Sequence, residues 1–175
     1  MTIRTNSYER SQEPIQIQRQ IEHQMVHEGK SFIVDISYGT VGAAINNVVI
    51  STNNSAVVHL RGLFSFNESG NHIITLYENP TITNLGNAQT VVAANRYTPE
   101  TKPSTISVYR DSDITSPGTQ LKIVYDFAKT GSGSLQNDAI PEFILNKNSN
   151  YYIKSQHYTP SGNLAISIGW YEYEH

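Results

Sequence analysis

The stretch SFIVDISY, residues 31–38, alternates apolar and polar side chains in the way expected of a β-strand with one buried face. In a strand, successive side chains point to opposite faces, so every second residue shares a face. One face of this stretch would carry Phe32, Val34, Ile36 and Tyr38. The opposite face is polar apart from Ile33, and Gly39 follows directly. The stretch therefore predicts a strand that packs one face against a hydrophobic core.

Eight further stretches of similar character follow along the chain: residues 44–51, 56–66, 72–78, 90–94, 105–111, 119–127, 150–156 and 163–173. Segments rich in Gly, Pro, Asn and Ser lie between them, and turn signals recur about every 8–15 residues. About nine short strands with such turns are typical of a two-sheet sandwich or a jelly roll. We therefore predict an all-β, jelly-roll-like β-sandwich over residues 29–175, preceded by an N-terminal arm and junction over residues 1–28.

Two segments and the strand order are less clearly specified. Residues 15–25, IQIQRQIEHQM, fit a strand and a short helix about equally well, because their apolar residues recur at both spacings. The segment AKTGSGSLQND, residues 128–138, predicts the most flexible loop. The pattern does not predict how the strands are ordered within the sheets.

The composition narrows the classes of function. The chain has 175 residues, about the size of one domain, and no cysteine, which excludes thiolate catalysis and Cys-based zinc sites. Its net charge is −3, and no stripe of Lys and Arg suggests binding to a phosphate backbone. The longest nearly uncharged stretch, residues 39–59, is too rich in Asn, Ser, Gly and Thr for a membrane span. We expect no nucleic-acid partner and no membrane partner.

The segment IEHQMVHEGKSF, residues 21–32, places His23 and His27 at the spacing with which a helix can aim two imidazoles at one metal ion. A zinc-protease helix needs Glu directly after the first His, whereas Gln24 stands there, and Gly29 would end the helix. Zinc also needs a third ligand. The remaining candidates, which no motif brings together, are His59, His72 and His157. We therefore predict no metal site and expect the histidines to form hydrogen bonds at an ordered junction.

Motifs of enzyme active sites are missing from the sequence. The glycines of GSGS, residues 131–134, lack the Lys and Ser/Thr of a phosphate-binding loop, and neither G-x-S-x-G nor H-x-H occurs. Asp111 and Asp113 are expected in a solvated turn. Glu172 and Glu174 share one face of the last strand, where we expect like charges to face water. We predict that the protein is not an enzyme and has no cofactor.

Aromatic residues gather in the last quarter of the chain. Trp170 shares a strand face with Ile168 and is expected in the core, whereas Tyr171 and Tyr173 fall on the opposite face. Exposed rings at these two positions would suit stacking on a sugar or anchoring a protein interface. The alternative, which is at least as well supported, is that both tyrosines pack against a neighbouring loop.

Five segments together resemble the small β-rich virion proteins of tailed bacteriophages: EHQMVHEGKSF (22–32), YENPTITNLG (77–86), AANRY (93–97), NYYIKSQ (150–156) and WYEYEH (170–175). Those proteins are described as minor capsid, head-decoration or cement proteins. The residues that match the shared pattern are Glu22, His23, His27, Gly29, Lys30 and Phe32, then Glu78, Pro80, Thr81, Thr83 and Gly86, then Asn95 and Arg96, and finally Trp170, Tyr171 and Glu172. The family often repeats Asn-Arg, whereas this chain continues with Tyr97 and Thr98.

The resemblance implies a non-enzymatic capsid decoration or cement protein that binds the major capsid protein on the head surface and stabilises the shell. Such a protein would be made in the host cytoplasm, would be located in the virion on the capsid surface, and would form a homotrimer on a symmetry axis. The residues expected to contact the capsid from the arm and junction are Arg4, Tyr8, Arg10, Ile15, Ile17, Arg19, His23, His27 and Lys30. The candidates for contacts between subunits are Tyr97, Tyr171 and Tyr173.

The alternative function is a carbohydrate- or receptor-binding domain of a phage head fibre or tail fibre. It depends on the aromatic residues near the end of the chain, because a glycan held by Tyr171 would favour this function over decoration.

Overall fold

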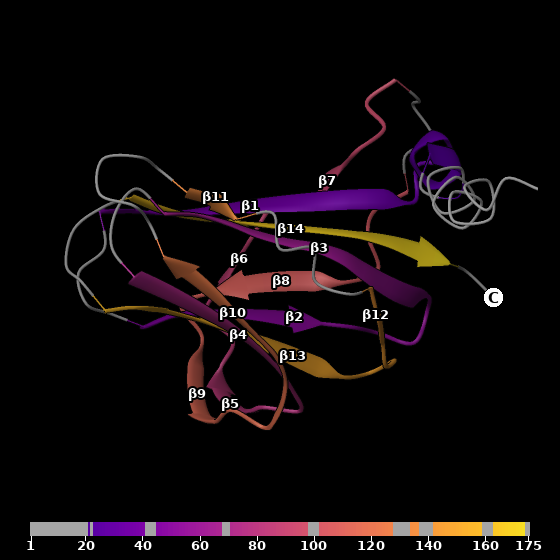
Figure 1. The fold of residues 1–175 in the computed structure, drawn as a ribbon. Helices are drawn as coiled ribbons and strands as arrows, with labels where there is room; N and C mark the ends of the chain where they lie inside the picture. Colours follow the sequence, from indigo (N-terminus) through magenta and orange to yellow (C-terminus); the bar gives the residue numbers. More distant parts are fainter. Residues whose placement is uncertain are drawn as a thin grey trace, which may run out of the picture.

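The computed structural model describes residues 21, 23–40, 45–67, 71–97, 102–127, 134–136, 142–158 and 163–173. In this part of the chain there are fourteen β-strands and a helical turn over residues 23–27. Figure 1 shows two sheets that face each other, with the helical turn at one end, close to β1. The prediction of an all-β sandwich is confirmed. The predicted arm, residues 1–20, lies outside the described residues.

The two large sheets contain six strands each, and all their pairings are antiparallel. Sheet A has the order β11 (Ser134–Gln136), β3 (Val57–Asn67), β14 (Asn163–Tyr173), β1 (Ser31–Thr40) and β7 (Val92–Ala93), with β12 (Phe143–Leu145) also paired to β3. Sheet B has the order β10 (Thr119–Phe127), β4 (Asn71–Glu78), β13 (Asn150–His157), β2 (Ile45–Ser51), β8 (Ser107–Arg110) and β6 (Asn87–Ala88). A two-stranded ribbon is formed by β5 (Thr81–Asn84) and β9 (Asp113–Ser116).

The pairing of the long strands is nested along the chain. The first strand, β1, pairs with the last, β14, and β2 pairs with β13. Further inward, β3 pairs with β11 and β12, and β4 pairs with β10. The contacts β14–β3 and β13–β4 then complete the two sheets. A long antiparallel hairpin folded across two sheets in this way is a jelly roll, so the structure supplies the strand order that the sequence pattern left open.

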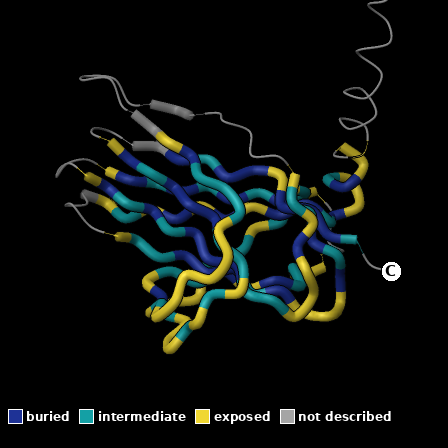
Figure 2. The backbone as a smooth tube through the Cα atoms, turned by 60° about the horizontal axis from the view of Figure 1, so that its bottom comes forward, coloured by how far each residue is buried: buried dark blue, intermediate teal, exposed yellow. Residues whose placement is uncertain are grey.

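The core lies between the inner faces of the two sheets. In β1 the inward side chains Phe32, Val34 and Ile36 are at most 4% exposed, whereas Ile33 points outward and is 37% exposed. This alternation confirms the prediction made from residues 31–38. Trp170 is fully buried and stacks on Phe32, with 6.0 Å between the ring centroids, so its predicted core position is also confirmed. Figure 2 shows buried and exposed segments alternating along the strands.

The observed strands differ from the predicted ones mainly where they are short. The stretches 119–127 and 163–173 are strands over the predicted residues, but 90–94 contains only the two-residue β7. The strand β11 lies within residues 128–138, where we predicted a loop. The ribbon strands and β12 were not predicted, because each has only three or four residues and little apolar alternation.

The ribbon is a bent continuation of the β4–β10 ladder. Glu78 at the end of β4 pairs with Thr119 of β10, and Thr81 of β5 then pairs with Ser116 of β9. The bend falls at Asn79 and Gly118, whose φ angles of 55° and 83° are left-handed. A left-handed φ costs little only for Gly and, to a lesser degree, Asn. The bend places the ribbon against the outer face of sheet B (Figure 1).

Replacing Gly118 by alanine should destabilise this bend. An added Cβ would overlap with the carbonyl oxygen of Glu78 and would lie 2.7 Å from the carbonyl carbon of Asn79. We expect Gly118→Ala to lower the free energy of unfolding by about 2–3 kcal/mol, measured by urea denaturation. Gly39→Ala is the matched control, because Gly39 also has a left-handed φ but an added Cβ there meets no atom within 4 Å. Equal losses for the two variants would show that backbone overlap at Gly118 is unimportant.

Candidate functional site

The junction between the arm and the sandwich is a helical turn closed by hydrogen bonds. The amide of Lys30 donates to the carbonyl of Met25 (2.9 Å), and the amide of Gly29 donates to the carbonyl of Val26 (3.1 Å). Gly29 has a φ of 69°, so these bonds form a Schellman motif with glycine in the left-handed position. Met25 is only 4% exposed and anchors the turn. The expectation that Gly29 ends the helix is confirmed.

His23 and His27 are brought together by this turn. Their Nε2 atoms lie 3.0 Å apart and their ring centroids 4.4 Å apart, and both side chains are exposed. The two imidazoles therefore bond to each other. Within the described ranges, no group of three or more His, Asp or Glu side chains is placed to hold a metal ion.

The loop after β7 docks onto the junction and presents Tyr97. The side-chain amide of Asn95 donates to the carbonyl of His27 (3.1 Å), and the amide of Ala94 donates to the carbonyl of Ser31 (2.8 Å). Asn95 Oδ1 also accepts a bond from the amide of Tyr97 (3.0 Å), whose side chain is 97% exposed. We call the exposed His23, His27 and Tyr97, together with the half-buried Lys30, the junction surface.

Lys30 carries a charge that is partly balanced within the junction. Its ammonium lies 2.8 Å from Glu28 Oε2, while Gln24 Nε2 donates to Glu28 Oε1 (2.6 Å). The hydrogen bonds from Lys30 and then Gln24 hold the pKa of Glu28 below its usual value. Lys30 is therefore oriented by Glu28 at the surface, and the pair is open to salt screening. Of the residues expected to contact the capsid, those in the arm, Arg4, Tyr8, Arg10, Ile15, Ile17 and Arg19, lie outside the described residues.

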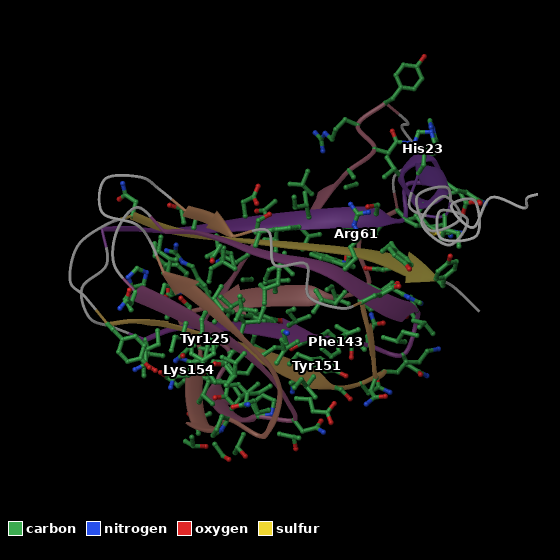
Figure 3. All side chains as sticks on the ribbon, viewed as in Figure 1. His23, Arg61, Tyr125, Phe143, Tyr151 and Lys154 are labelled. Carbon is green, nitrogen blue, oxygen red and sulfur yellow. The ribbon has the colours of Figure 1, made fainter. Side chains whose placement is uncertain are left out.

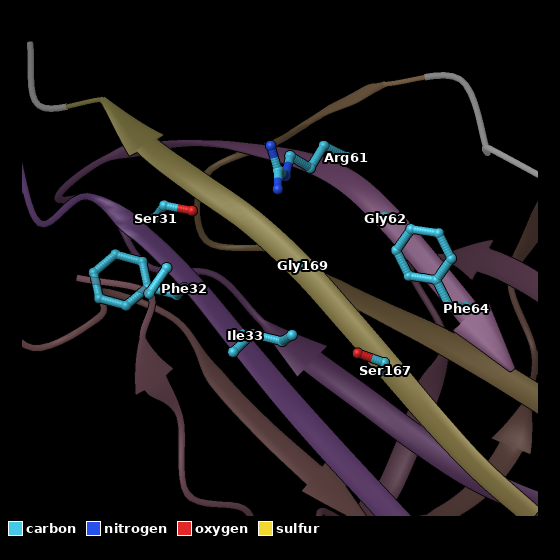
Figure 4. Close-up of a pocket in the computed structure, with 9 residues that line it drawn as sticks. Ser31, Phe32, Ile33, Arg61, Gly62, Phe64, Ser167 and Gly169 are labelled. Carbon is cyan, nitrogen blue, oxygen red and sulfur yellow. The ribbon is translucent and has the colours of Figure 1, made fainter. Parts of the chain in front are cut away.

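A groove on the outer face of sheet A adjoins the junction. It has a volume of about 330 Å³, and Ser31 and Ala94 line its end nearest the junction. Its floor includes the cross-strand pair Gly62 and Gly169. Figure 4 shows Ile33 and Phe64 on opposite sides of Gly169. The groove is therefore flat at its base, with Ile33 and Phe64 as apolar walls and Arg61 as a basic one, and it adjoins the junction through Ser31 and Ala94.

The tyrosines of β14 have different surroundings. Tyr171 is only 7% exposed, because its ring stacks on His59 (centroids 4.7 Å apart) and its hydroxyl donates to Glu142. His59 Nδ1 bonds to the same carboxylate at 2.7 Å. Tyr173 is half-buried and meets His59 edge-on. Tyr171 thus packs against the segment before β12, as the alternative prediction had it, and offers little surface to a second subunit.

Glu172 does not face water, so the prediction for this residue is wrong. It is 4% exposed, and its carboxylate accepts bonds from Trp170 Nε1 (3.0 Å), the Ser104 hydroxyl (2.6 Å) and the amide of Thr105 (2.9 Å). Glu172 shares the inward face of β14 with Trp170, and residues 104 and 105 close over that end of the sandwich. Asp111 and Asp113 are exposed, as predicted, but only Asp111 lies in a bend, because Asp113 begins strand β9.

Three segments that are distant in the sequence meet at the junction. Asn95 bonds to His27, Ala94 bonds to Ser31, and the amide of Glu172 donates to the carbonyl of Lys30 (2.9 Å). These residues belong to the first, third and last of the segments on which the family resemblance depends. The second segment, residues 77–86, instead forms the bend and β5 of the ribbon.

Two groupings of side chains in the structure were not predicted from the sequence. His72 and His157 form a cross-strand pair on the inner face of sheet B, with ring centroids 4.6 Å apart and at most 2% exposure. On the outer face of the same sheet, Tyr77 stacks on Tyr152 beside Lys154. A signal was present for His72, Tyr77, Tyr152 and Lys154, which fall within the predicted strands 72–78 and 150–156, and His157 directly follows the second of these strands, but the pairing between the two strands could not be predicted.

Comparison with known proteins leaves the family open. No protein-family model, no curated protein and no solved structure matches this chain. In the described part of the chain, no helix is both long enough and apolar enough to cross a membrane. The functional interpretation therefore depends on the site and on the residues that carry the resemblance.

Proposed function

We propose that this protein is a non-enzymatic phage capsid decoration or cement protein that binds the major capsid protein and stabilises the shell. The observation that carries the proposal is that three of the five segments resembling phage virion proteins, residues 22–32, 93–97 and 170–175, meet at the junction end of the sandwich. The Asn95 side chain bonds to the carbonyl of His27 and Gly29 closes the helical turn, while Tyr97 extends into solvent. A surface ordered before binding loses little conformational entropy when a partner docks.

The junction surface offers the kinds of contact that protein interfaces use. Tyr97 provides a large aromatic ring, and because Asn95 ties it to the capsid-contact candidate His27, we propose it as a contact to the capsid rather than to a second subunit. The groove of sheet A adjoins the same end. The arm would add a strand to an edge of the capsid protein, with main-chain hydrogen bonds providing affinity. In a homotrimer on a capsid symmetry axis, three copies of these contacts bind together, so modest single contacts yield firm attachment. The protein would thus act on the outer surface of the capsid.

Replacing Tyr97 by alanine should weaken capsid binding by about tenfold, because a central exposed aromatic ring often dominates an interface. The measurement is co-sedimentation with expanded, undecorated capsids of the phage that encodes the protein. Tyr97→Ala should leave the fold intact, since the side chain is 97% exposed. Tyr158→Ala is the matched control, because Tyr158 is 52% exposed and follows β13 at the other end of the sandwich.

Two outcomes would contradict the proposal: wild-type protein that stays in the supernatant, or a Tyr97→Ala variant that binds as tightly as Tyr158→Ala.

Deleting residues 1–14 should weaken capsid binding without unfolding the sandwich, which circular dichroism would verify. Unchanged affinity after this deletion would remove the arm from the mechanism. Sedimentation equilibrium tests the trimer separately.

A further inference from the structure

The ribbon and the outer face of sheet B enclose a second pocket, on the side of the sandwich away from sheet A. Its volume is about 250 Å³. The sheet contributes Asn47, Tyr77, Tyr152 and Lys154, and the ribbon side contributes Ile114 and Pro117. Figure 3 places Lys154 on sheet B, far from Arg61 and His23 on the sheet A side. Ligand sites are typically apolar hollows of this kind with a few fixed polar groups.

The aromatic floor of the pocket is rigid. Tyr77 and Tyr152 are direct cross-strand partners, and their rings stack with centroids 5.5 Å apart and an interplanar angle of 17°. The Tyr152 hydroxyl donates to Asn47 Oδ1 (2.6 Å), and Asn47 Nδ2 donates to the carbonyl of Ser112 (3.0 Å). These bonds use the polar groups of Tyr152 and Asn47. The half-buried Tyr77 keeps its hydroxyl free of any hydrogen bond to a described residue.

Lys154 places one positive charge at this floor. Its strand partners are Asn47 on one side and Thr75 on the other, and neither carries a charge. Within the ranges that the structure describes, its ammonium group makes no ion pair. A half-buried lysine that lines the pocket together with two tyrosines favours a ligand that brings a negative charge, since a charge-assisted hydrogen bond is stronger than a neutral one.

We propose that this pocket binds one pyranose ring that carries a carboxylate, that is, an acidic sugar residue of a glycan. The C–H face of the ring would pack on Tyr77 and be covered by Ile114 and Pro117, because aromatic and aliphatic surfaces remove those C–H groups from water. The carboxylate would meet the ammonium of Lys154, and the Tyr77 hydroxyl would bond to a ring hydroxyl. The pocket volume suits a single ring, with the rest of the glycan in solvent.

This inference is independent of capsid decoration. The pocket lies on sheet B, whereas the junction surface and the groove lie at the arm end and on sheet A. An attached protein would therefore keep the pocket exposed. Loss of capsid binding in Tyr97→Ala and loss of sugar binding in a pocket variant are separate results.

The test is an NMR titration of ¹⁵N-labelled protein with methyl glucuronide and with methyl glucoside, which differ only at C6. We expect saturable shifts around Tyr77, Tyr152 and Lys154, with the glucuronide binding about fivefold more tightly than the glucoside. Lys154→Gln should abolish this preference. Lys147→Gln, which removes a positive charge from an exposed turn outside the pocket, should preserve it.

Tyr77→Leu should abolish binding of both sugars, because it removes the ring and its hydroxyl. The amide spectrum and the thermal midpoint show whether this variant folds. If it does not fold, the Lys154→Gln variant alone tests whether the pocket binds the acidic sugar. The proposal is overturned if neither sugar produces saturable shifts, if the shifts map outside the pocket, or if the two lysine variants behave alike.

Discussion

Glu172→Ala is expected to lower the free energy of unfolding by about 2–4 kcal/mol, because it removes the acceptor of one buried donor, Trp170 Nε1, and of two half-buried donors, on Ser104 and Thr105. The carboxylate now receives bonds from Trp170, Ser104 and Thr105 at the end of the core. Removing it would release residues 104 and 105 from the sandwich and expose the edge of Trp170. Urea denaturation, followed by the fluorescence of Trp170, measures the loss directly, since the chain contains one tryptophan.

Two variants separate the loss of hydrogen bonds from the loss of charge. Glu172→Gln keeps one acceptor oxygen and should show about half the destabilisation of the alanine variant. Glu28→Ala removes an exposed carboxylate and should leave the unfolding transition nearly unchanged. If Glu172→Ala unfolds at the same urea concentration as Glu28→Ala, the buried network contributes nothing to stability.

The stability of the protein should fall in acid because of the buried histidine pair. Burial, and then the neighbouring His157, lower the pKa of His72 to about 3, compared with about 6.5 in an unfolded chain. The unfolded state therefore binds the proton more readily than the folded state. The stability contributed by neutral His72 is fully present above pH 6.5 and is lost as the pH falls toward 3. Between pH 6.5 and pH 3 we expect a slope of about 1.4 kcal/mol per pH unit, or about 5 kcal/mol in total.

The check is a series of urea titrations between pH 7 and pH 4 on wild type and on His72→Gln. The variant loses the stacking on His157, so it should be less stable at pH 7, but its stability should depend less on pH. His23→Gln is the control, because His23 is exposed at the junction and should leave the slope unchanged. Parallel slopes for wild type and His72→Gln would rule out His72 as the source of acid sensitivity.

The alternation of apolar and polar residues correctly predicted those strands in which one face is buried along the whole length. In β1 and in β14 the apolar side chains recur at a period of two over many residues, and the predicted strands match the observed ones to within two residues. Trp170 was placed in the core by the same rule. Gly29 was identified as the end of the helix because glycine is the residue best suited to a left-handed φ.

The remaining features depend on contacts between strands, which one sequence does not specify. The ribbon strands carry single apolar residues such as Ile82 and Ile114, and their pairing shifts register around these positions, so no periodicity marks them. His72 and His157 become neighbours only because β4 and β13 pair. Glu172 was misplaced because a carboxylate is normally exposed, and only residues 104 and 105, from a distant part of the chain, make its burial possible.

The nested strand pairing also bears on the synthesis of the protein. The long pairing of β1 is with β14, so β1 cannot complete its sheet contacts until β14 has been synthesised. Folding of such a high-contact-order chain is slow, and unpaired strands are exposed meanwhile. A prematurely terminated chain would lack both β14 and Glu172, whose amide bonds to Lys30. Formation of the junction therefore requires β14, and a chain that ends before β14 would keep β1 unpaired and open to proteolysis.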